Sequence, residues 1–268
     1  MDVLKIFKIV LIAVVALYLL IFIVTSVFQE KLLFVPKTLP VDFEYDFPVQ
    51  FEEFFLTGTD GQAKLNALHF KVENPKGVVL YYHGNAGHLA DWGWVMQDYS
   101  HRGFDVIVMD YRTYGKSTGT LSEKALYSDA QLFYDYAANL YDEKEIIVYG
   151  RSLGTTFAAY VASQNNPSKL LLEAPFYSMK SLAGEMFPIF PVSWVLRYSF
   201  PTYKYLEKVE CSVYILHGTE DEMVPFKHGK KLSETLPKDQ MRFIPILNGG
   251  HNNLVEEQEF KIALDSIL

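Results

Sequence analysis

Short apolar runs that alternate with longer amphipathic stretches fill the chain from residue 78 onward. Continuous apolar strands of this kind are typical of parallel sheets that helices cover on both faces. The alternation therefore predicts a three-layer α/β sandwich with right-handed crossovers. The predicted strands are Val78–Tyr82, Asp105–Met109, Ile146–Tyr149, Leu170–Leu172, Val213–Leu216 and Phe243–Ile246, and the predicted helices cover 89–101, 122–141, 153–164, 227–236 and 253–267.

A hairpin is predicted to precede this alternating region. Its strands are Val49–Thr57 and Lys64–Val72, and the turn Gly58-Thr59-Asp60-Gly61 joins them. Residues 30–48 contain three prolines, which is typical of a linker that packs onto the domain. Thr120 and Glu123 have the spacing of a capping box, so we expect Thr120 to begin the helix that follows.

The N-terminal run Ile9–Phe28 contains no charge, glycine or proline. A helix of that length spans roughly 30 Å, which is the hydrocarbon thickness of a bilayer. The run is too long for a typical signal peptide and no small-x-small cleavage site follows it, while a buried core helix would usually show a polar face. We therefore expect a single-pass membrane anchor over residues 1–28 and one domain over 29–268.

Flanking charges only slightly favour one orientation of this anchor. Lys5 and Lys8 precede the run, and Lys31 and Lys37 follow it. The bias towards positive residues on the cytoplasmic side is therefore nearly balanced. The charges leave the side of the membrane open, with a lean towards a non-cytoplasmic domain.

Composition argues against several classes of protein. The chain has 24 Lys and Arg against 32 Asp and Glu, and the net charge of −8 disfavours nucleic-acid binding. A single cysteine, Cys211, excludes an internal disulfide framework and a cysteine-rich zinc site. No P-loop, Gly-x-Gly-x-x-Gly or His-Glu-x-x-His motif occurs, so we expect no cofactor and no metal.

A candidate nucleophile lies in Gly150-Arg151-Ser152-Leu153-Gly154, between a predicted strand and a predicted helix. In this context a Gly-x-Ser-x-Gly motif holds its serine in a strained turn with the hydroxyl exposed. The glycines lack the Cβ atoms that would collide in so tight a turn. An ordinary Gly- and Ser-rich turn is the alternative, but the strand–turn–helix context favours Ser152 as a nucleophile.

The same edge of the sheet offers a base and an acid. His251 follows the last predicted strand, at the carboxyl edge where ligands bind in open parallel sheets. Asp221 follows the preceding strand, and the chain order Ser, Asp, His is that of nucleophile-elbow enzymes. Such an acid holds the tautomer of the base. Glu220 and Glu222 are neighbouring alternatives, and Glu173 is the more distant rival.

Two backbone N–H groups are candidates for an oxyanion hole. A tetrahedral intermediate needs donors aimed at its oxygen. We expect one N–H from Leu153 and the other from Asn85, in the loop His83-Gly84-Asn85-Ala86-Gly87. The alternative is that this loop is a dispensable glycine-rich connection.

Residues 176–205 interrupt the alternation with nine aromatic residues and three prolines. Long inserts in compact domains are usually lids or binding loops. We expect this insert to lie over Ser152 and to accept an apolar acyl group. The simpler alternative is a helix whose apolar face packs on the core.

These motifs together resemble the α/β-hydrolase superfamily, and most closely a membrane-anchored branch of serine hydrolases with relatives that act as protein depalmitoylases. The resemblance implies that Ser152, Asp221 and His251 form a catalytic triad. Thr113 is a departure, because the group commonly has glycine there. The stretches that carry the resemblance are Gln29–Phe34, His83–Gly87, Asp110–Ser117, the Ser152 elbow, Glu173–Phe176, His217–Asp221 and Gly250–Asn252.

The sequence thus predicts a membrane-tethered serine hydrolase that cleaves an ester or thioester through an acyl-enzyme. Its expected substrate is a small-molecule or lipid-like acyl compound. A catalytically inactive hydrolase fold that serves as a binding module at the membrane is the alternative. Epoxide and haloalkane hydrolases of this fold normally have a carboxylate at the elbow, where this chain has Ser152.

Overall fold

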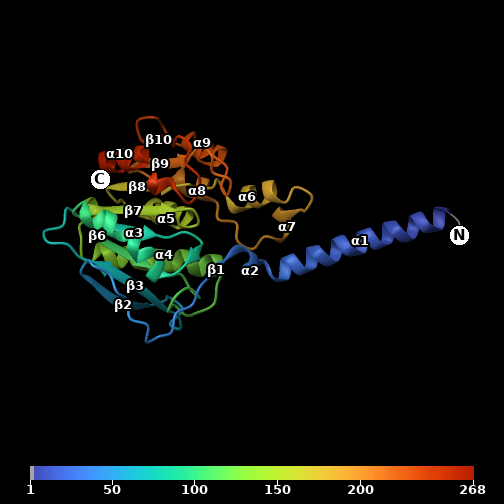
Figure 1. The fold of residues 1–268 in the computed structure, drawn as a ribbon, viewed down its shortest axis with the longest axis horizontal. Helices are drawn as coiled ribbons and strands as arrows, with labels where there is room; N and C mark the ends of the chain where they lie inside the picture. Colours follow the sequence, from blue (N-terminus) through green and yellow to red (C-terminus); the bar gives the residue numbers. More distant parts are fainter. Residues whose placement is uncertain (1–2) are drawn as a thin grey trace.

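An eight-stranded, mostly parallel sheet runs through the domain in the computed structural model (Figure 1). The structure describes residues 3–268, apart from the side chains of residues 192 and 193. Strands from β4 to β10 are parallel, and β3 and β2 add an antiparallel hairpin at one edge. The predicted fold class and strands are therefore confirmed, with shifts of a few residues at their ends. The order across the sheet is β10 (Met241–Ile246), β9 (Ser212–Gly218), β8 (Lys169–Glu173), β7 (Ile146–Arg151), β4 (Val78–Tyr82), β6 (Asp105–Met109), β3 (Lys64–Phe70) and β2 (Phe51–Thr57).

Helices cover both faces of this sheet, which explains why its central strands are apolar on both sides. One core cluster includes Phe133 and Phe157, and the other includes Tyr99 and Phe260. The structure splits the last predicted helix into a short 3-10 turn, η2, and α10. The helices that pack on the sheet are α3 (Leu89–His101), α4 (Glu123–Ala138), α5 (Gly154–Gln164), α9 (Lys227–Ser233) and α10 (Gln258–Ile267), with 3-10 turns η1 (Glu143–Glu145) and η2 (Leu254–Glu256).

The cap of α4 differs from the expected capping box. Ser122, not Thr120, is the N-cap residue, and its hydroxyl accepts a hydrogen bond from the backbone N–H of Ala125. The Glu123 carboxylate instead accepts bonds from the backbone N–H and hydroxyl of Ser199. The capping prediction was wrong because a tertiary contact with the insert recruits this glutamate.

The linker packs onto the domain as predicted. It begins with a short helix, α2 (Gln29–Leu33), and continues into β1 (Val35–Pro36). β1 pairs in parallel with β5 (Ala86–Gly87), which belongs to the loop after β4. The linker is therefore hydrogen-bonded, through strand pairing, to the loop after β4, which is predicted to carry the oxyanion donor Asn85.

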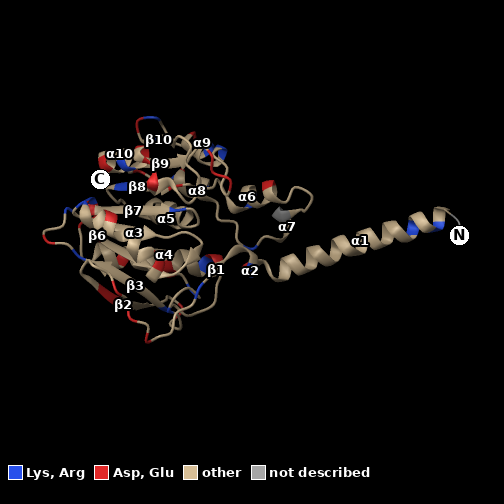
Figure 2. Ribbon diagram, viewed as in Figure 1, with Lys and Arg blue, Asp and Glu red and all other residues tan. Residues whose placement is uncertain are grey.

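The N-terminal helix α1 (Val3–Val27) extends away from the domain (Figure 1). It is long and apolar enough to cross a membrane, and none of its side chains is buried. Lys5 and Lys8, near its start, are its only basic residues, and the rest of the described helix has no charge (Figure 2). An exposed apolar surface of this size fits a membrane span.

The aromatic insert divides into two parts with different surroundings. Tyr198, Phe200 and Leu206 are buried in the core, as the simpler alternative predicts. The earlier part carries α6 (Met179–Met186) and α7 (Val192–Val195) and projects beside α1 (Figure 1). The last helix of the insert, α8 (Thr202–Leu206), packs on α5.

Thr113 has a backbone φ of 73°, in the left-handed region that favours glycine. A β-branched residue pays a steric penalty there. Its buried hydroxyl has no hydrogen-bond partner among residues 3–268. The resemblance places glycine at this position, so the departure in sequence coincides with local strain.

We therefore expect Thr113→Gly to raise the free energy of unfolding by about 1 kcal/mol. Relief of the left-handed penalty, roughly 1–2 kcal/mol, should exceed the chain entropy that glycine adds to the unfolded state, roughly 0.5–1 kcal/mol. Chemical unfolding of the full chain in detergent, followed by tryptophan fluorescence, measures the change. The matched control is Thr59→Gly, at an exposed turn position without positive φ, which should give no gain. Equal stability changes in the two variants contradict this explanation.

Candidate active site

Ser152 occupies a strained turn between β7 and α5. Its backbone φ is 50°, which an L-residue rarely adopts. A Cβ atom at Gly154 would collide with the carbonyl oxygen of Tyr82, and one at Gly150 would collide with the carbonyl of Gly154. The backbone N–H of Ser152 donates to the carbonyl of Glu173 at 2.9 Å. The two glycines thus let three backbone segments meet around the serine.

His251 lies between Ser152 and Asp221, within hydrogen-bond distance of both. Its Nε2 is 3.0 Å from the Ser152 Oγ, and its Nδ1 is 2.8 Å from Asp221 Oδ2. An ionised carboxylate only accepts hydrogen bonds, so Nδ1 carries the proton and Nε2 is left to accept from the serine hydroxyl. The structure therefore brings together the three residues that the sequence singled out, in the order a proton relay needs.

Asp221 is held by several donors at once. Its Oδ1 accepts from the backbone N–H groups of Met223 and Val224, at 2.9 and 2.7 Å. Burial of the carboxyl group works to raise the pKa of Asp221, but bonds from His217 and His251 outweigh it and hold that pKa well below its usual value. Asp221 is therefore an anion at neutral pH.

His217 is a partner of Asp221 that the sequence did not assign. Its Nε2 is 2.8 Å from the carbonyl oxygen of Val224 and 3.4 Å from Asp221 Oδ2. Because a carbonyl oxygen only accepts, Nε2 must carry the proton. The His217 side chain is fully buried. Its position in a His-Gly pair at the end of a strand was the available signal, but it did not reveal the role.

Glu173, the rival acid, lies in a different set of contacts. It accepts from the hydroxyl of Tyr149 at 2.8 Å, and its Oε1 is 3.0 Å from Arg151 Nε. Glu220 and Glu222 are exposed. Of the four carboxylates considered, Asp221 is the one hydrogen-bonded to His251.

Arg151 connects the serine turn to the histidine loop. One terminal nitrogen of its guanidinium donates to the carbonyl of His251 at 3.1 Å, and the group lies over the ring of Trp92 at 5.1 Å. With Glu173 neutralising its charge, Arg151 ties the backbone beside His251 to the residue before Ser152. As the variable position of the motif, it carried no signal in the sequence.

The peptide groups that carry the Leu153 and Asn85 N–H groups are both held in place. The carbonyl of Ser152 accepts from the backbone N–H of Thr155, and the carbonyl of Gly84 is 2.7 Å from His83 Nδ1. In a trans peptide the N–H points opposite to the carbonyl, so both orientations are fixed. Neither N–H donates to another group in the described part of the chain, which leaves both available to a ligand.

Tyrosines from the loop after β6 support the loop that carries Asn85. The hydroxyl of Tyr111 donates to the carbonyl of His83, and that of Tyr114 donates to the carbonyl of Asn85, both at 2.7 Å. The side-chain amide of Asn85 donates to the carbonyl of Leu33 in α2 at 2.6 Å. The glycine-rich loop is therefore tightly bonded, in contrast to a dispensable connection.

Comparisons with known proteins agree with this fold. The model of the family described as serine aminopeptidase, S33, matches residues 73–212, just over half of the chain. That match includes Asn85 and Ser152 and ends before Asp221 and His251. An esterase of Pyrococcus furiosus has a similar structure, with a TM-score of 0.65, 18% sequence identity and coverage of 87% of this chain and 96% of its own.

Two curated proteins are similar to this chain in sequence. The chain is 31% identical to the alpha/beta hydrolase domain-containing protein aho-3 of Caenorhabditis elegans, over 66% of this chain and 53% of that protein. It is also 31% identical to the lysophosphatidylserine lipase ABHD12 of Danio rerio, over 63% of this chain and 51% of that protein. The matches thus span about half the length of these relatives. By its family match and its fold, the chain belongs to the serine aminopeptidase S33 family of the α/β-hydrolase superfamily.

Proposed function

We propose that this protein is a membrane-tethered serine hydrolase that cleaves an ester or thioester. The observation that carries the proposal is the continuous hydrogen-bonded path from the Ser152 hydroxyl through His251 to Asp221. A serine hydroxyl is a weak nucleophile unless an adjacent base accepts its proton. Here the base is in contact with the hydroxyl, and the base is itself oriented by a carboxylate.

The proposed reaction runs in two halves. Ser152 Oγ attacks the acyl carbon while His251 Nε2 takes the hydroxyl proton, and Asp221 stabilises the resulting imidazolium. The N–H groups of Leu153 and Asn85 hold the negative oxygen of the tetrahedral intermediate. Collapse of the intermediate breaks the bond to the alcohol or thiol, which receives the proton from His251. Water, activated by the same histidine, then hydrolyses the acyl-enzyme.

We further infer that the substrate carries an apolar acyl group. The insert over 176–205 is rich in aromatic residues and prolines, and we assign it as a lid or cap of the domain 29–268. The relative in Danio rerio is named a lysophosphatidylserine lipase, which supports a lipid-like substrate for this chain. An inactive binding module would have no need for the complete path from Ser152 to Asp221. These steps require no metal and no cofactor.

We further propose that residues 1–28 anchor the domain as a single-pass span. The support is the apolar helix α1, whose described residues are all exposed apart from a few half-buried near its C-terminal end. The nearly balanced lysines lean towards a domain on the non-cytoplasmic side.

Replacement of the nucleophile tests the reaction class. We expect Ser152→Ala to lose labelling by a fluorophosphonate probe and to lower kcat by about 10⁶-fold, as removal of the nucleophile does in a comparable triad enzyme. Its circular dichroism should match that of the wild type. Turnover close to the wild-type value would end the serine-hydrolase proposal.

A pair of isosteric substitutions tests which carboxylate acts as the partner of His251. Asp221→Asn should lower kcat by roughly 10⁴-fold, because the amide favours the wrong tautomer of His251. Glu173→Gln should mainly lower the thermal midpoint, since it leaves buried Arg151 without its counter-charge. Hydrolysis of a p-nitrophenyl ester and thermal unfolding of both variants measure these effects. The reverse ranking would assign the acid to Glu173.

Membrane attachment is tested by alkaline carbonate extraction. The full chain should stay in the pellet, and mass spectrometry of the mature protein should recover residues 1–28. Val15→Arg places a charge in the middle of α1, at a cost of about 2.5–3.5 kcal/mol for insertion, and should shift protein to the supernatant. Val41→Arg, in an exposed part of the linker, is the matched control and should not. Release of the wild type by carbonate, or a mature chain that lacks the helix, contradicts the anchor.

A further inference from the structure

A cavity of about 310 Å³ lies between the end of α1 and the insert. It is at the lower end of the size range of ligand pockets. Its walls come from two segments that are at least 150 residues apart in the chain. The apolar side chains that line it include Ile21, Phe22 and Leu33 on one side and Ala183, Phe187 and Phe190 on the other.

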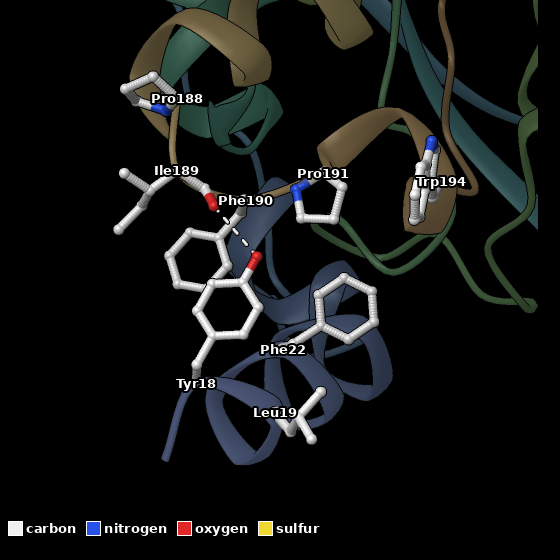
Figure 3. Close-up of a pocket in the computed structure, with 8 residues that line it drawn as sticks. All are labelled: Tyr18, Leu19, Phe22, Pro188, Ile189, Phe190, Pro191 and Trp194. Carbon is white, nitrogen blue, oxygen red and sulfur yellow. Dashed lines mark hydrogen bonds between the residues drawn. The ribbon is translucent and has the colours of Figure 1, made fainter. Parts of the chain in front are cut away.

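A second cavity, of about 590 Å³, adjoins the first along α1 (Figure 3). The two cavities share Phe22 and Phe190 as lining residues, and we refer to them together as the anchor groove. The ring of Tyr18 stacks on Phe190 at 5.2 Å, and its hydroxyl donates to the carbonyl of Ile189 at 3.1 Å. The helix and the insert are thus in direct contact along this groove.

The polar side chains that line the smaller of the two cavities already have hydrogen-bond partners. Thr25 and Ser26 donate to carbonyls of their own helix. Gln29 is buried, and its amide donates to the carbonyl of Val195 while its oxygen accepts from the N–H of Arg197. The smaller cavity therefore offers few free groups to a polar ligand, and an apolar ligand there would leave none of these side chains unpaired.

The tip of the insert has the composition of a lipid-facing segment. In the sequence, Glu185 and Arg197 bracket eleven residues without a charge. Ile189 and Trp194 are 74% and 83% exposed. Tyr18, which the tip contacts, lies nine residues before the end of α1, or about 14 Å along the helix. If α1 spans a bilayer, the tip lies at the depth of one leaflet.

The inner end of the anchor groove approaches the catalytic loop. Leu33 lines the cavity, and its carbonyl accepts from the side chain of Asn85. Ala183 lines it from α6, which follows β8, the strand that pairs with β7 just before Ser152. A chain that lies in the groove would therefore point one end towards the proposed oxyanion donors.

We propose that the anchor groove binds the long acyl chain of a substrate that enters sideways from the bilayer. The membrane helix then supplies part of the substrate pocket in addition to tethering the domain. The proposal rests on the proposed hydrolase function and adds the source and class of its substrate. Esters and thioesters of long acyl chains share this chemistry, so both are included in the test.

The test compares the full chain and its variants in phosphatidylcholine nanodiscs. A methylene that leaves water adds about 0.8 kcal/mol, or roughly fourfold in kcat/KM, until the pocket is full. The wild type should therefore favour palmitoyl over acetyl p-nitrophenyl esters, and palmitoyl over acetyl thioesters. Ile21→Trp and Ala183→Phe fill the groove and should lower these palmitoyl-to-acetyl ratios at least tenfold.

Leu20→Trp is the matched control, because it adds the same side chain one residue away on α1 and Leu20 does not line the described cavities. Its ratios should equal those of the wild type. Equal ratios in all three variants overturn the anchor groove as an acyl site. Fluorophosphonate labelling in the same samples tests the proposed hydrolase reaction separately. Variants that are labelled but keep the wild-type ratios would contradict the acyl site in the groove and leave the hydrolase proposal intact.

A second measurement does not depend on turnover. The full-length Ser152→Ala chain is placed in vesicles of phosphatidylcholine with a diazirine at the end of one acyl chain. Photolysis should crosslink the lipid to Leu33 and to Ala183, which both lie beyond the end of α1. Ala183→Phe should suppress the crosslink between the lipid and Leu33. Crosslinks confined to α1, with none on either residue, would overturn the proposal even if the folded protein were inactive.

Discussion

The close approach of the backbone at Gly154 to the carbonyl of Tyr82 is the constraint on which the site depends. It leaves no room for a side chain, so α5 begins directly against the end of β4. This contact brings the turn of Ser152 beside the loop of Asn85. The strained φ at Ser152 is maintained because β7, which leads into the turn, is buried and paired with β4 on one side and β8 on the other. The Ser152 hydroxyl and the two proposed backbone donors, at Leu153 and Asn85, are thus positioned by the sheet.

Asp221 and His251 come from the two strands at the far edge of the sheet, β9 and β10. Asp221 follows β9, and His251 follows β10, so parallel pairing carries both to the same edge. Arg151, Glu173 and Tyr149 then connect the serine strand to the histidine loop through a buried ion pair and two hydrogen bonds. The arrangement of these partners explains why buried charges occur beside an apolar sheet: each one is neutralised by a neighbour.

Local and periodic features of the fold were predictable from the sequence. The strands, the hairpin and the serine turn follow from apolar periodicity and glycine spacing. The proximity of Ser152, Asp221 and His251 follows from where parallel strands end. Contacts between distant segments were not predictable in this way. Glu123 looked like a capping residue until the insert supplied its partner. Arg151 carried no signal, and the His-Gly pair of His217 indicated its position at the sheet edge but not its role.

The packing of the insert on α1 illustrates the same limit. Aromatic composition indicated that residues 176–205 bury apolar surface, but composition does not specify which surface. The core and the site were the two surfaces considered. The structure adds a third, the apolar helix α1. Pairing of Gln29 with Val195 and Arg197 requires a tertiary fold in which two remote segments already meet.

Gln29 and Glu30 also make the junction between α1 and the domain stiff. Gln29 bonds to two backbone groups of the insert, and the Glu30 carboxylate accepts from the hydroxyl of Tyr198. A flexible linker would let the domain swivel freely, whereas directional bonds at the base of the helix make helix and domain turn together. Transmembrane helices tilt to match the thickness of their bilayer. With α1 as the proposed span, this junction would let a thicker or thinner membrane change the angle at which the whole domain faces the lipid surface.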